Sequence, residues 1–424
     1  MQVNKSNDLL LDVHEKPKPL QWAVLSIQHV FAMFGATVLV PIIVGFPVSV
    51  ALFASGIGTL IYIVATKAKV PVYLGSSFAY ITAMIFAQEA LGGKSDAWQT
   101  AIIIVGLIYV AVAILVYFIG TKWIDRLLPP VVIGPMIAII GLGLAPVAVE
   151  QAGLTAGGDI KVIMVAIITF LITALVSTYA KGFLKIIPFI IGIVGGYVVA
   201  YLFGLVDFQP IIDAPWFQLP ELKLPFALGN FDTYEFYFGP EMWAIVPISI
   251  VTISEHIGDH TVLSKICNRN FLKDPGLTRT LIGDGVATAV SALIGGPANT
   301  TYGENTGVVG MTKIASVYVV GGAAVVAIAL SFLGKVSAFI STIPDPVLGG
   351  MSMLLYGVIA SNGLRALVDA QVDFSKQRNL IIASAMLVVG LGGAVLQMSS
   401  LVTLSGTALA ALVGVILNLI LPKE

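Results

Sequence analysis

The chain has 424 residues, of which 58% are hydrophobic and only 11% are charged, and its formal net charge is −1. Because soluble domains carry roughly 25% charged residues, this composition excludes an ordinary water-soluble fold and argues against nucleic-acid binding. The single cysteine, Cys267, excludes an internal disulfide and a cysteine-based metal cluster.

The N-terminal segment, residues 1–19, is polar and lacks the short apolar core of a signal peptide, so we expect a cytoplasmic tail. Beyond it, stretches long enough to cross about 30 Å of hydrocarbon recur along the whole chain. We count about fourteen such spans, of which the third and the tenth are too short and too polar for ordinary spanning helices. Because only helices satisfy their own backbone in lipid, the predicted fold is an all-α integral membrane bundle.

Basic residues predict the orientation of these spans. If the spans alternate from an inside N-terminus, the inside segments hold all but four of the 22 Lys and Arg residues. The four on the outside are Lys94, Lys161, Lys223 and Lys335. Because cytoplasmic loops carry an excess of Lys and Arg, we expect both termini on the cytoplasmic side of the cell membrane.

The connection over residues 207–240 is acidic and is predicted to be an extracellular or periplasmic loop between two similar halves. Two patterns recur in the same order in both halves: Gly56-x-Gly58 before Pro71 matches Gly283-x-Gly285 before Pro297, and Pro130-Val131-x-x-Gly134 matches Pro346-Val347-x-x-Gly350. With seven spans per half, an odd number, the second copy is inverted. We therefore predict a 7+7 inverted repeat with the site at the repeat interface.

The two segments that follow Pro71 and Pro297 are the most unusual in the chain. They read PVYLGSSFAY over residues 71–80 and PANTTYGENTG over residues 297–307. Both start extended after a proline, are rich in small or hydroxyl residues and lead into a short apolar helix. Non-helical backbone at this depth is tolerated where it is buried or faces a cavity, so we expect two crossed half-helices flanking a pocket. The alternative is a pair of helices kinked for packing.

Acidic residues inside spans give a sharper signal, because an Asp at the bilayer centre costs about 2.5 to 3.5 kcal/mol on insertion. Glu304 begins span ten, and span eight contains Glu255 and Asp259, which share one helical face. His256 and His260 share a neighbouring face. We favour a proton-linked site, since burial brings a carboxyl group toward protonation near neutral pH.

Two other interpretations of this cluster are weaker. A His-x-x-x-His pair can bind zinc, but this one lacks the glutamate that follows the first histidine in metalloproteases, so no metal and no cofactor are predicted. A buried structural network is the second alternative. Asp284 in span nine is left outside the site, because it falls near the predicted cytoplasmic end, where water would solvate it.

Three aromatic residues, Phe78, Tyr302 and Tyr356, are candidates for stacking on a flat ring. Aromatic residues are also common in packing and at membrane interfaces, so the spacing of these three does not show whether they bind a ligand.

The pattern Glu304-Asn305-x-Gly307-x-x-x-x-Thr312-Lys313 resembles the signature of the nucleobase/ascorbate transporter family, also called nucleobase:cation symporter family 2. Three further motifs resemble that family, and the likeness covers about residues 20 to 421: Gln28-His29, Gly75-Ser76-Ser77-Phe78 and Ser254-Glu255-His256-x-Gly258.

Within the family, the segments around residues 74–79, 299–305 and 354–359 are similar to the bacterial uracil permeases, which are uracil:proton symporters. This resemblance implies that Glu255 and Glu304 bind the ring N–H groups and that the backbone amides of Phe78 and Gly303 meet the carbonyl oxygens. Tyr302 and Tyr356 are then further substrate-binding candidates, and Glu255, Asp259 and His260 are candidates for proton coupling.

The resemblance also implies a division into two domains. A core domain would comprise residues 20–119 (spans one to four) and 241–338 (spans eight to eleven), and a gate domain would comprise 120–206 and 339–424. The implied partners are uracil, a proton and membrane lipids, with a homodimer formed through the gate domain. Uracil presents two N–H donors and two carbonyl acceptors, which two carboxylates and two backbone amides would satisfy.

The chain departs from the uracil permease branch at Asp259. Some uracil permeases carry a histidine at this position, whereas this chain has its histidine one residue later, at His260. Which residue relays the proton therefore stays open. Two other functions also stay open: a xanthine, urate or other nucleobase:cation symporter, and an anion exchanger or channel of the same architecture. The anion proteins would favour a basic lining. An enzyme is not expected, because we find no convincing nucleophile or metal set.

Overall fold

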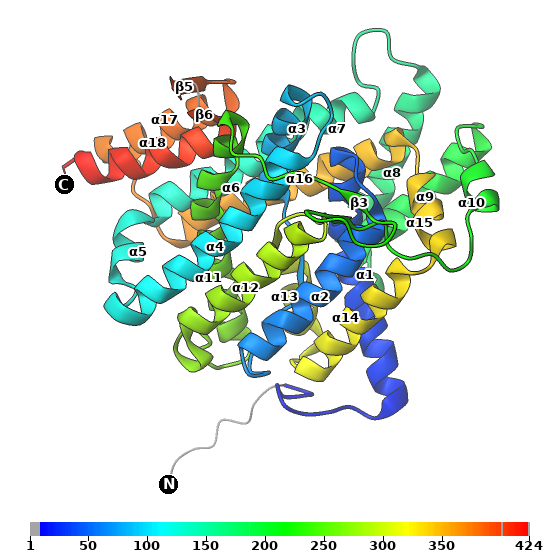
Figure 1. Cartoon of the computed structure of the whole chain (residues 1–424), viewed down its shortest axis with the longest axis horizontal. Coiled ribbons are helices and arrows are strands. Elements are labelled where there is room, and N and C mark those ends of the chain that lie inside the picture. The colour runs from blue at the N-terminus through cyan, green and yellow to red at the C-terminus, as the bar shows by residue number, and fades with distance from the viewer. Residues whose placement is uncertain (1–8, 186, 400–401, 423–424) are drawn as a thin grey trace.

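The computed structural model describes residues 9–185, 187–399 and 402–422, and most of these residues are helical. Figure 1 shows the chain from its N-terminus in blue to its C-terminus in red. Lys5 and Lys423, two of the basic residues that predict the orientation, lie outside the described residues.

The α-helices of the first half are α1 (Pro19–Val44), α2 (Val48–Ala65), α3 (Ile81–Ala90), α4 (Asp96–Ile119), α5 (Lys122–Leu127), α6 (Pro130–Gly143), α7 (Ala145–Gln151), α8 (Ile160–Tyr179), α9 (Pro188–Leu202) and α10 (Gln209–Asp213). Those of the second half are α11 (Ser249–Ile266), α12 (Leu277–Leu293), α13 (Gly303–Thr312), α14 (Val317–Ser331), α15 (Gly334–Ser341), α16 (Asp345–Asp369), α17 (Gln377–Leu391) and α18 (Gly406–Ile420).

Short helical turns are η1 (Phe78–Tyr80), η2 (Gly182–Lys185), η3 (Pro240–Ala244), η4 (Val246–Ile248) and the π-type turn η5 (Leu272–Gly276). The strands are β1 (Leu74–Ser76), β2 (Lys223–Leu224), β3 (Asp232–Thr233), β4 (Asn299–Thr301), β5 (Val395–Ser399) and β6 (Val402–Ser405).

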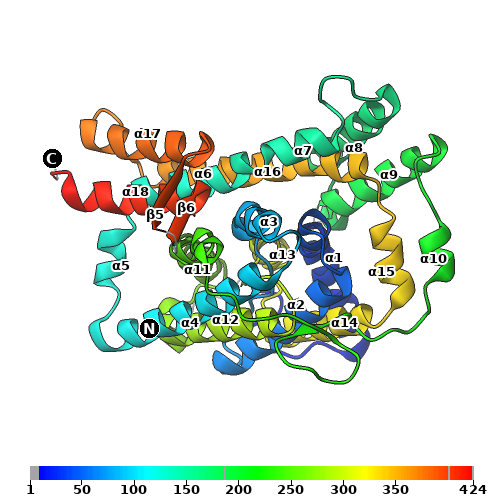
Figure 2. The same ribbon diagram turned by 45° about the horizontal axis from the view of Figure 1, so that its top comes forward.

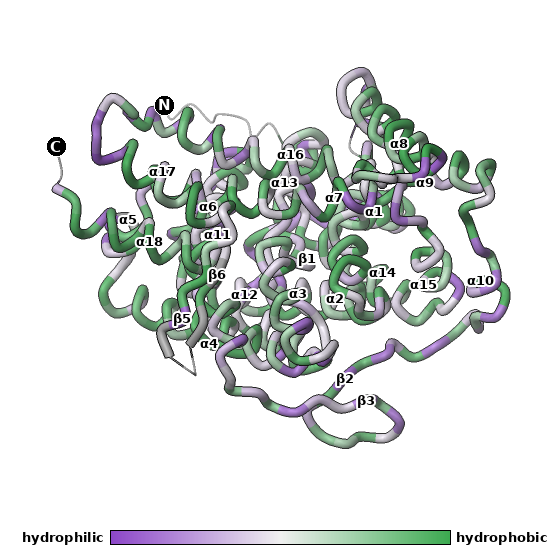
Figure 3. The backbone as a smooth tube through the Cα atoms, turned by 90° about the horizontal axis from the view of Figure 1, so that it is seen from above, coloured by the Kyte–Doolittle hydropathy of each residue, from purple (hydrophilic) through white to green (hydrophobic). Residues whose placement is uncertain are grey.

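Several helices have the length and composition of membrane spans. Among the described residues, six helical stretches are long and apolar enough to cross a bilayer, and α9, α14, α17 and α18 are shorter apolar helices. The helix α8 buries only 22% of its most apolar window, so its apolar side chains face outward, as expected where lipid is the solvent. Figure 3 shows hydrophobic colour along the helices and hydrophilic colour in connections such as the segment around α10.

The helices form two groups that Figure 2 separates clearly. In the first group, α2 and α12 pack against each other, α4 packs on α12, and α14 packs on α2 and α1. In the second group, α16 packs against α6, α8 and α9, and α17 packs against α6 and α18. The helices α1, α3, α11 and α13 lie between the two layers (Figure 2).

Glycines allow the helices of the first group to approach closely. A Cβ on Gly106 of α4 would lie 2.5 Å from the carbonyl oxygen of Gly285, and a Cβ on Gly285 of α12 would lie 2.6 Å from the carbonyl oxygen of Gly106. On the other side, a Cβ on Gly56 of α2 would lie 2.6 Å from the carbonyl oxygen of Ala324 in α14. Any larger side chain at these positions would push the helix axes apart.

The extended segments expected after Pro71 and Pro297 are present as strands. Strand β1 pairs with β4 in an antiparallel ladder in which Leu74 lies opposite Thr301 and Ser76 opposite Asn299. After each strand the chain enters a short helical stretch, η1 with α3 after the first and α13 after the second.

Two other strand pairs were not predicted, so the fold is less purely α-helical than expected. The strands β2 and β3 pair within the connection between the halves. The strands β5 and β6 form a hairpin, whose β6 packs near η3. The hairpin follows Gly392 and Gly393, which end α17, and the apolar residues of this stretch do not distinguish a strand from a helix by composition alone.

Candidate functional site

The crossing of β1 and β4 sets the geometry of the candidate site. Its ladder is three residues long, and it is extended by bonds from Tyr302 N to Tyr73 O (3.1 Å) and from Ser77 N to Ala298 O (2.9 Å). Because the strands are antiparallel, η1 begins beyond one end of the ladder and α13 beyond the other. Two helix N-termini, neither capped by the side chain of its N-cap residue, therefore lie at opposite ends of the crossing.

Side chains from the neighbouring helices hold this ladder in place. The hydroxyl of Thr59 in α2 donates to Leu74 O (3.2 Å) and accepts from Leu74 N (2.9 Å). From α12, Thr288 donates to Asn299 O at 3.2 Å, while the amide of Asn299 donates to Ala287 O at 3.2 Å. The helices α2 and α12 of the first group thus hold the two strands in place.

Three carboxylates approach the ends of this crossing. Glu304 is the second residue of α13, and Glu255 and Asp259 lie one turn apart on α11, which packs against α13. All three side chains are partly buried, and they interact electrostatically with one another. Among the described residues, only Asp259 of the three has a side-chain hydrogen bond to another residue, accepting from the Thr301 hydroxyl at 2.5 Å.

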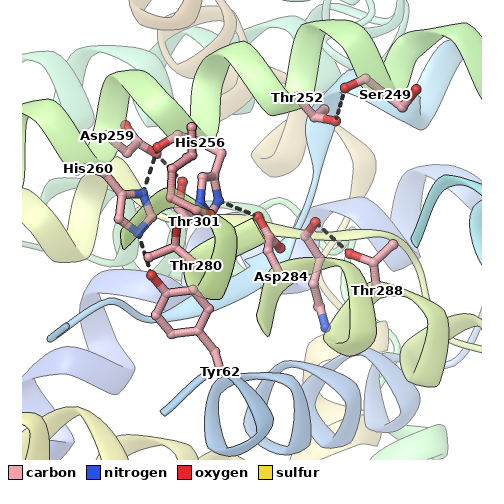
Figure 4. Close-up of polar contacts among 12 residues, drawn as sticks. Tyr62, Ser249, Thr252, His256, Asp259, His260, Thr280, Asp284, Thr288 and Thr301 are labelled. Carbon is pink, nitrogen blue, oxygen red and sulfur yellow. Dashed lines mark hydrogen bonds and ion pairs between the residues drawn. The ribbon is translucent and has the colours of Figure 1, made fainter. Parts of the chain in front are cut away.

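The neighbouring face of α11 carries the two histidines, and Figure 4 shows their contacts. Nδ1 of His256 lies 2.7 Å from Oδ2 of Asp284 in α12, and both side chains are completely buried. The rings of His256 and His260 stack with centroids 4.1 Å apart, as their helical spacing predicts. These contacts tie α11 to α12.

His260 is held on both ring nitrogens. Its Nδ1–H donates to the carbonyl oxygen of His256 at 2.6 Å, so in the neutral ring Nε2 is the acceptor of the Tyr62 hydroxyl of α2. This arrangement leaves neither nitrogen of His260 facing the carboxylates. His260 was a sequence-based candidate for proton coupling, and its contacts are those of an anchor between α11 and α2.

The candidate aromatic residues occupy different positions. Tyr302 is buried beneath the crossing: its hydroxyl donates to Ser76 O and accepts from Thr37, both at 3.1 Å, and its ring lies against Gly75. Phe78 and Tyr356 meet edge to face with centroids 6.3 Å apart, joining η1 to α16 of the second group. Phe78 and Tyr356 therefore lie where the two groups of helices meet, whereas Tyr302 supports the crossing.

Glu304 opens onto a small cleft between the two groups of helices. Its lining comes from α1, the α9 region, α13 and α16: Phe31, Ala32, Gly35, Ala36, Ile187, Phe189, Ile190, Glu304 and Leu355. The lining is apolar except for the carboxylate. The accessible volume of the cleft is about 10 Å³, room for about one water molecule, so a flat ring does not fit in it in this conformation.

Comparisons with known proteins decide the family. The sequence pattern described as the permease family matches residues 20–399. The chain belongs to this family, the nucleobase/ascorbate transporter family. It is therefore a multi-pass membrane transporter rather than an enzyme.

Curated relatives cover nearly the whole chain. The uracil permease of Bacillus caldolyticus is 50% identical over 98% of this chain and 95% of its own length. The uracil permease of Bacillus subtilis is 48% identical over 97% of this chain and 95% of its own length. The Escherichia coli K12 uracil permease is 43% identical over 97% of this chain and 93% of its own length.

Solved structures share the fold at low sequence identity. The transmembrane domain of the cyanobacterial bicarbonate transporter BicA matches with a TM-score of 0.63 at 17% identity, covering 96% of this chain and 98% of that one. Murine Slc26a9, an anion transporter in the inward-facing state, matches with a TM-score of 0.69 at 12% identity, covering 96% of this chain and 69% of that one.

Sequence reasoning did not assign Asp284, Tyr62 or His29 to this region. The expectation that water solvates Asp284 is wrong: its side chain is fully buried, because α4 and α12 pack closely around it. His29 of α1 accepts from the Asn305 side chain on its carbonyl oxygen at 3.0 Å, which fixes the first turn of α13. The signal for His29 and Asn305 was present, since both belong to quoted motifs, but no motif indicates that they touch.

The buried pair of His256 and Asp284 leads to a stability prediction. Asp284→Ala leaves Nδ1 of His256 without a partner in a fully buried position, at a cost of about 1 to 3 kcal/mol. We expect a clear drop in the thermal unfolding temperature of the purified protein in detergent. The matched control is Asp274→Ala, which breaks an ion pair with Lys69 whose side chains are 70% and 37% exposed, and which should shift unfolding much less. Equal shifts for both variants would contradict a structural role of the buried pair.

Proposed function

We propose that this protein takes up uracil together with protons across the cytoplasmic membrane, as a uracil:proton symporter that works by alternating access. The observation that carries the proposal is the pair of partly buried carboxylates, Glu255 and Glu304, which make no side-chain hydrogen bond to another residue in the described part of the chain and lie beside two helix N-termini that their N-cap side chains do not cap. The three relatives described above are uracil permeases, which supports the same substrate.

Uracil complements this site chemically. In the proposed complex, Glu255 and Glu304 accept from the ring N–H groups, and the backbone amides of Phe78 and Gly303 donate to the carbonyl oxygens. Phe78 and Tyr356 cover the ring from the side of the second helix group. Leaving any of these polar groups unpaired would cost about 1 to 3 kcal/mol, which would select a ring with this donor and acceptor pattern.

Proton coupling is assigned to Glu255 and Asp259. A proton on this carboxylate pair would neutralise charge in a low-dielectric region before the site moves between the two sides of the membrane. Asp259 suits this role because it lies next to Glu255 on the face of α11 toward α13 and holds Thr301 of the crossing. His260 is the weaker candidate, since Tyr62 and a backbone carbonyl engage both of its nitrogens.

The proposed architecture is fourteen spans in a 7+7 inverted repeat. The packing of the two halves is reciprocal, which supports this arrangement. The helix α4 of the first half packs on α12 of the second, and its counterpart α14 packs on α2, the counterpart of α12. Three further elements pack directly against their own counterparts: α2 against α12, α6 against α16, and β1 against β4. We assign the first helix group, together with the helices between the layers, to a core domain (20–119 and 241–338) and the second group to a gate domain (120–206 and 339–424). The helix α15 spans the last of these boundaries.

A xanthine or urate symporter and an anion exchanger are the alternative functions. The anion transporters share the fold, but the cleft beside Glu304 contains no Lys or Arg among its lining residues. An anionic substrate would meet Glu304 with no compensating positive charge. A homodimer through the gate domain and cytoplasmic placement of both termini stay predictions.

Uptake into proteoliposomes tests the proposed function. We expect labelled uracil to accumulate above equilibrium when the pH outside is lower than inside, and accumulation to stop when a protonophore is added. Unlabelled xanthine and urate should compete poorly. Uracil entry that only equilibrates, or accumulation that ignores the pH gradient, would contradict proton symport, and stronger competition by a purine would change the substrate.

A further inference from the structure

The segment before α1 is built into the helix bundle. Residues 9–15, called the strap here, run across one end of the bundle, where Figure 1 shows the blue chain before α1 begins. Leu10 N donates to Lys313 O at 2.7 Å, Ala315 N donates to Leu11 O at 2.8 Å, and Val317 N donates to Val13 O at 3.0 Å. The strap thus pairs along the chain that joins α13 to α14.

Local conformation explains why the strap binds there. Lys313 ends α13 in the left-handed region with φ of 58°, which turns its carbonyl away from the helix axis. The residues that follow are extended, and Leu11 forms a parallel bridge with Ile314. An extended edge next to an open helix end offers unpaired backbone groups, and the strap satisfies them.

Side chains of the strap reach a second element, the end of α11. Val13 is fully buried in an apolar cluster that also contains Leu263 of α11, Cys267 and Val309 of α13. Beside it, the Asp12 carboxylate accepts from the Arg269 guanidinium at 2.6 Å, with both side chains about one-third exposed, 32% and 35% respectively. The strap therefore contacts the two elements that carry the three carboxylates.

We propose that the strap is a positioning element for the substrate site, which holds α13 with Glu304 in register with α11 and its Glu255 and Asp259. The helix α13 has only 10 residues, and its N-cap residue, Tyr302, makes no side-chain cap hydrogen bond. A short helix of this kind depends on contacts at its ends, and the strap supplies them at the end away from Glu304. The inference rests on the proposed assignment of these carboxylates to uracil.

The test compares two truncations of the full chain. Removing residues 2–15 deletes the strap, whereas removing residues 2–8 keeps it and is the matched control. We expect the uracil Kd, measured by titration calorimetry in detergent, to rise about tenfold without the strap, because small misplacements of binding groups are costly. The control should bind like the unmodified protein.

A charge exchange tests the ion pair within the strap. Asp12→Arg and Arg269→Asp each place two like charges side by side, and we expect each to weaken uracil binding about threefold. The double variant restores an opposite-charge pair and should recover the original Kd within about twofold. Failure of the double variant to recover binding would overturn the positional role of this contact.

Two readouts separate positioning from simple stabilisation. If the strap only stabilised the fold, its removal would lower the number of binding sites per chain and leave the Kd of the remaining sites unchanged, which would overturn the proposal. Hydrogen exchange supplies a readout that needs no uracil: α13 amides should exchange at least about tenfold faster without the strap. If the unmodified protein binds no uracil, the proposed function fails, and unchanged exchange in α13 would independently refute the strap.

Discussion

Glu304→Ala is expected to abolish uracil binding, with a Kd raised at least about 100-fold. In the proposed complex Glu304 accepts one ring N–H, and its carboxylate is the polar group of an otherwise apolar cleft. Alanine would leave that N–H without its acceptor. Charged hydrogen bonds are also about twice as strong as neutral ones. Titration calorimetry of the purified protein measures the loss directly.

A graded series sharpens this prediction. Glu304→Gln keeps the size of the side chain and one acceptor oxygen, so it should bind uracil more weakly than the unmodified protein and more strongly than Glu304→Ala. Glu89→Ala is the matched control, because Glu89 lies in the last turn of the other half-helix, α3, and is exposed there. An unchanged Kd for Glu304→Ala would remove Glu304 from the site, and the same loss for Glu89→Ala would point to a general effect of removing acidic charge.

Local signals in the sequence predict the centre of this structure well. Pro71 and Pro297 remove a backbone donor, and the small and hydroxyl residues after them are weak helix formers, so extended backbone is favoured where the strands are found. The spacing of four residues on α11 predicts that Glu255 and Asp259 share a face and that the two histidines stack. Each of these features depends on residues close together in the chain.

Features that depend on distant packing were not predictable in this way. Asp284 was misplaced because its burial comes from the close approach of α4 and α12, which two glycines far apart in sequence permit. The direction in which Tyr302 points follows from the alternation of side chains along an extended chain. The Thr301 side chain points toward α11, where it donates a hydrogen bond to Asp259. The side chain of Tyr302 therefore points to the other face, where its ring lies against Gly75. The periodicity of the sequence predicts which residues share a face of a helix or strand. It does not predict which other helix or strand that face packs against.

Glu255→Gln is expected to separate uracil transport from the proton gradient. Glutamine keeps the size of the side chain and an oxygen that accepts the ring N–H, so uracil should still bind, with a Kd raised about tenfold. It cannot exchange a proton, so the charge at the site no longer changes between loaded and empty states. We expect proteoliposomes to exchange labelled for unlabelled uracil at a measurable rate while accumulation under an imposed pH gradient falls to equilibrium.

The parallel variant Asp259→Asn tests how the two carboxylates of α11 divide the work. Its side-chain oxygen still accepts from the Thr301 hydroxyl, so the contact to the crossing survives while the acidic proton is lost. If Asp259 shares the proton, accumulation should fall in this variant as well, with exchange retained. If Asp259 only holds Thr301, accumulation should persist. Accumulation by Glu255→Gln that a protonophore still abolishes would move the coupling proton away from Glu255, and Asp259 would then be the first group on α11 to test, ahead of His260.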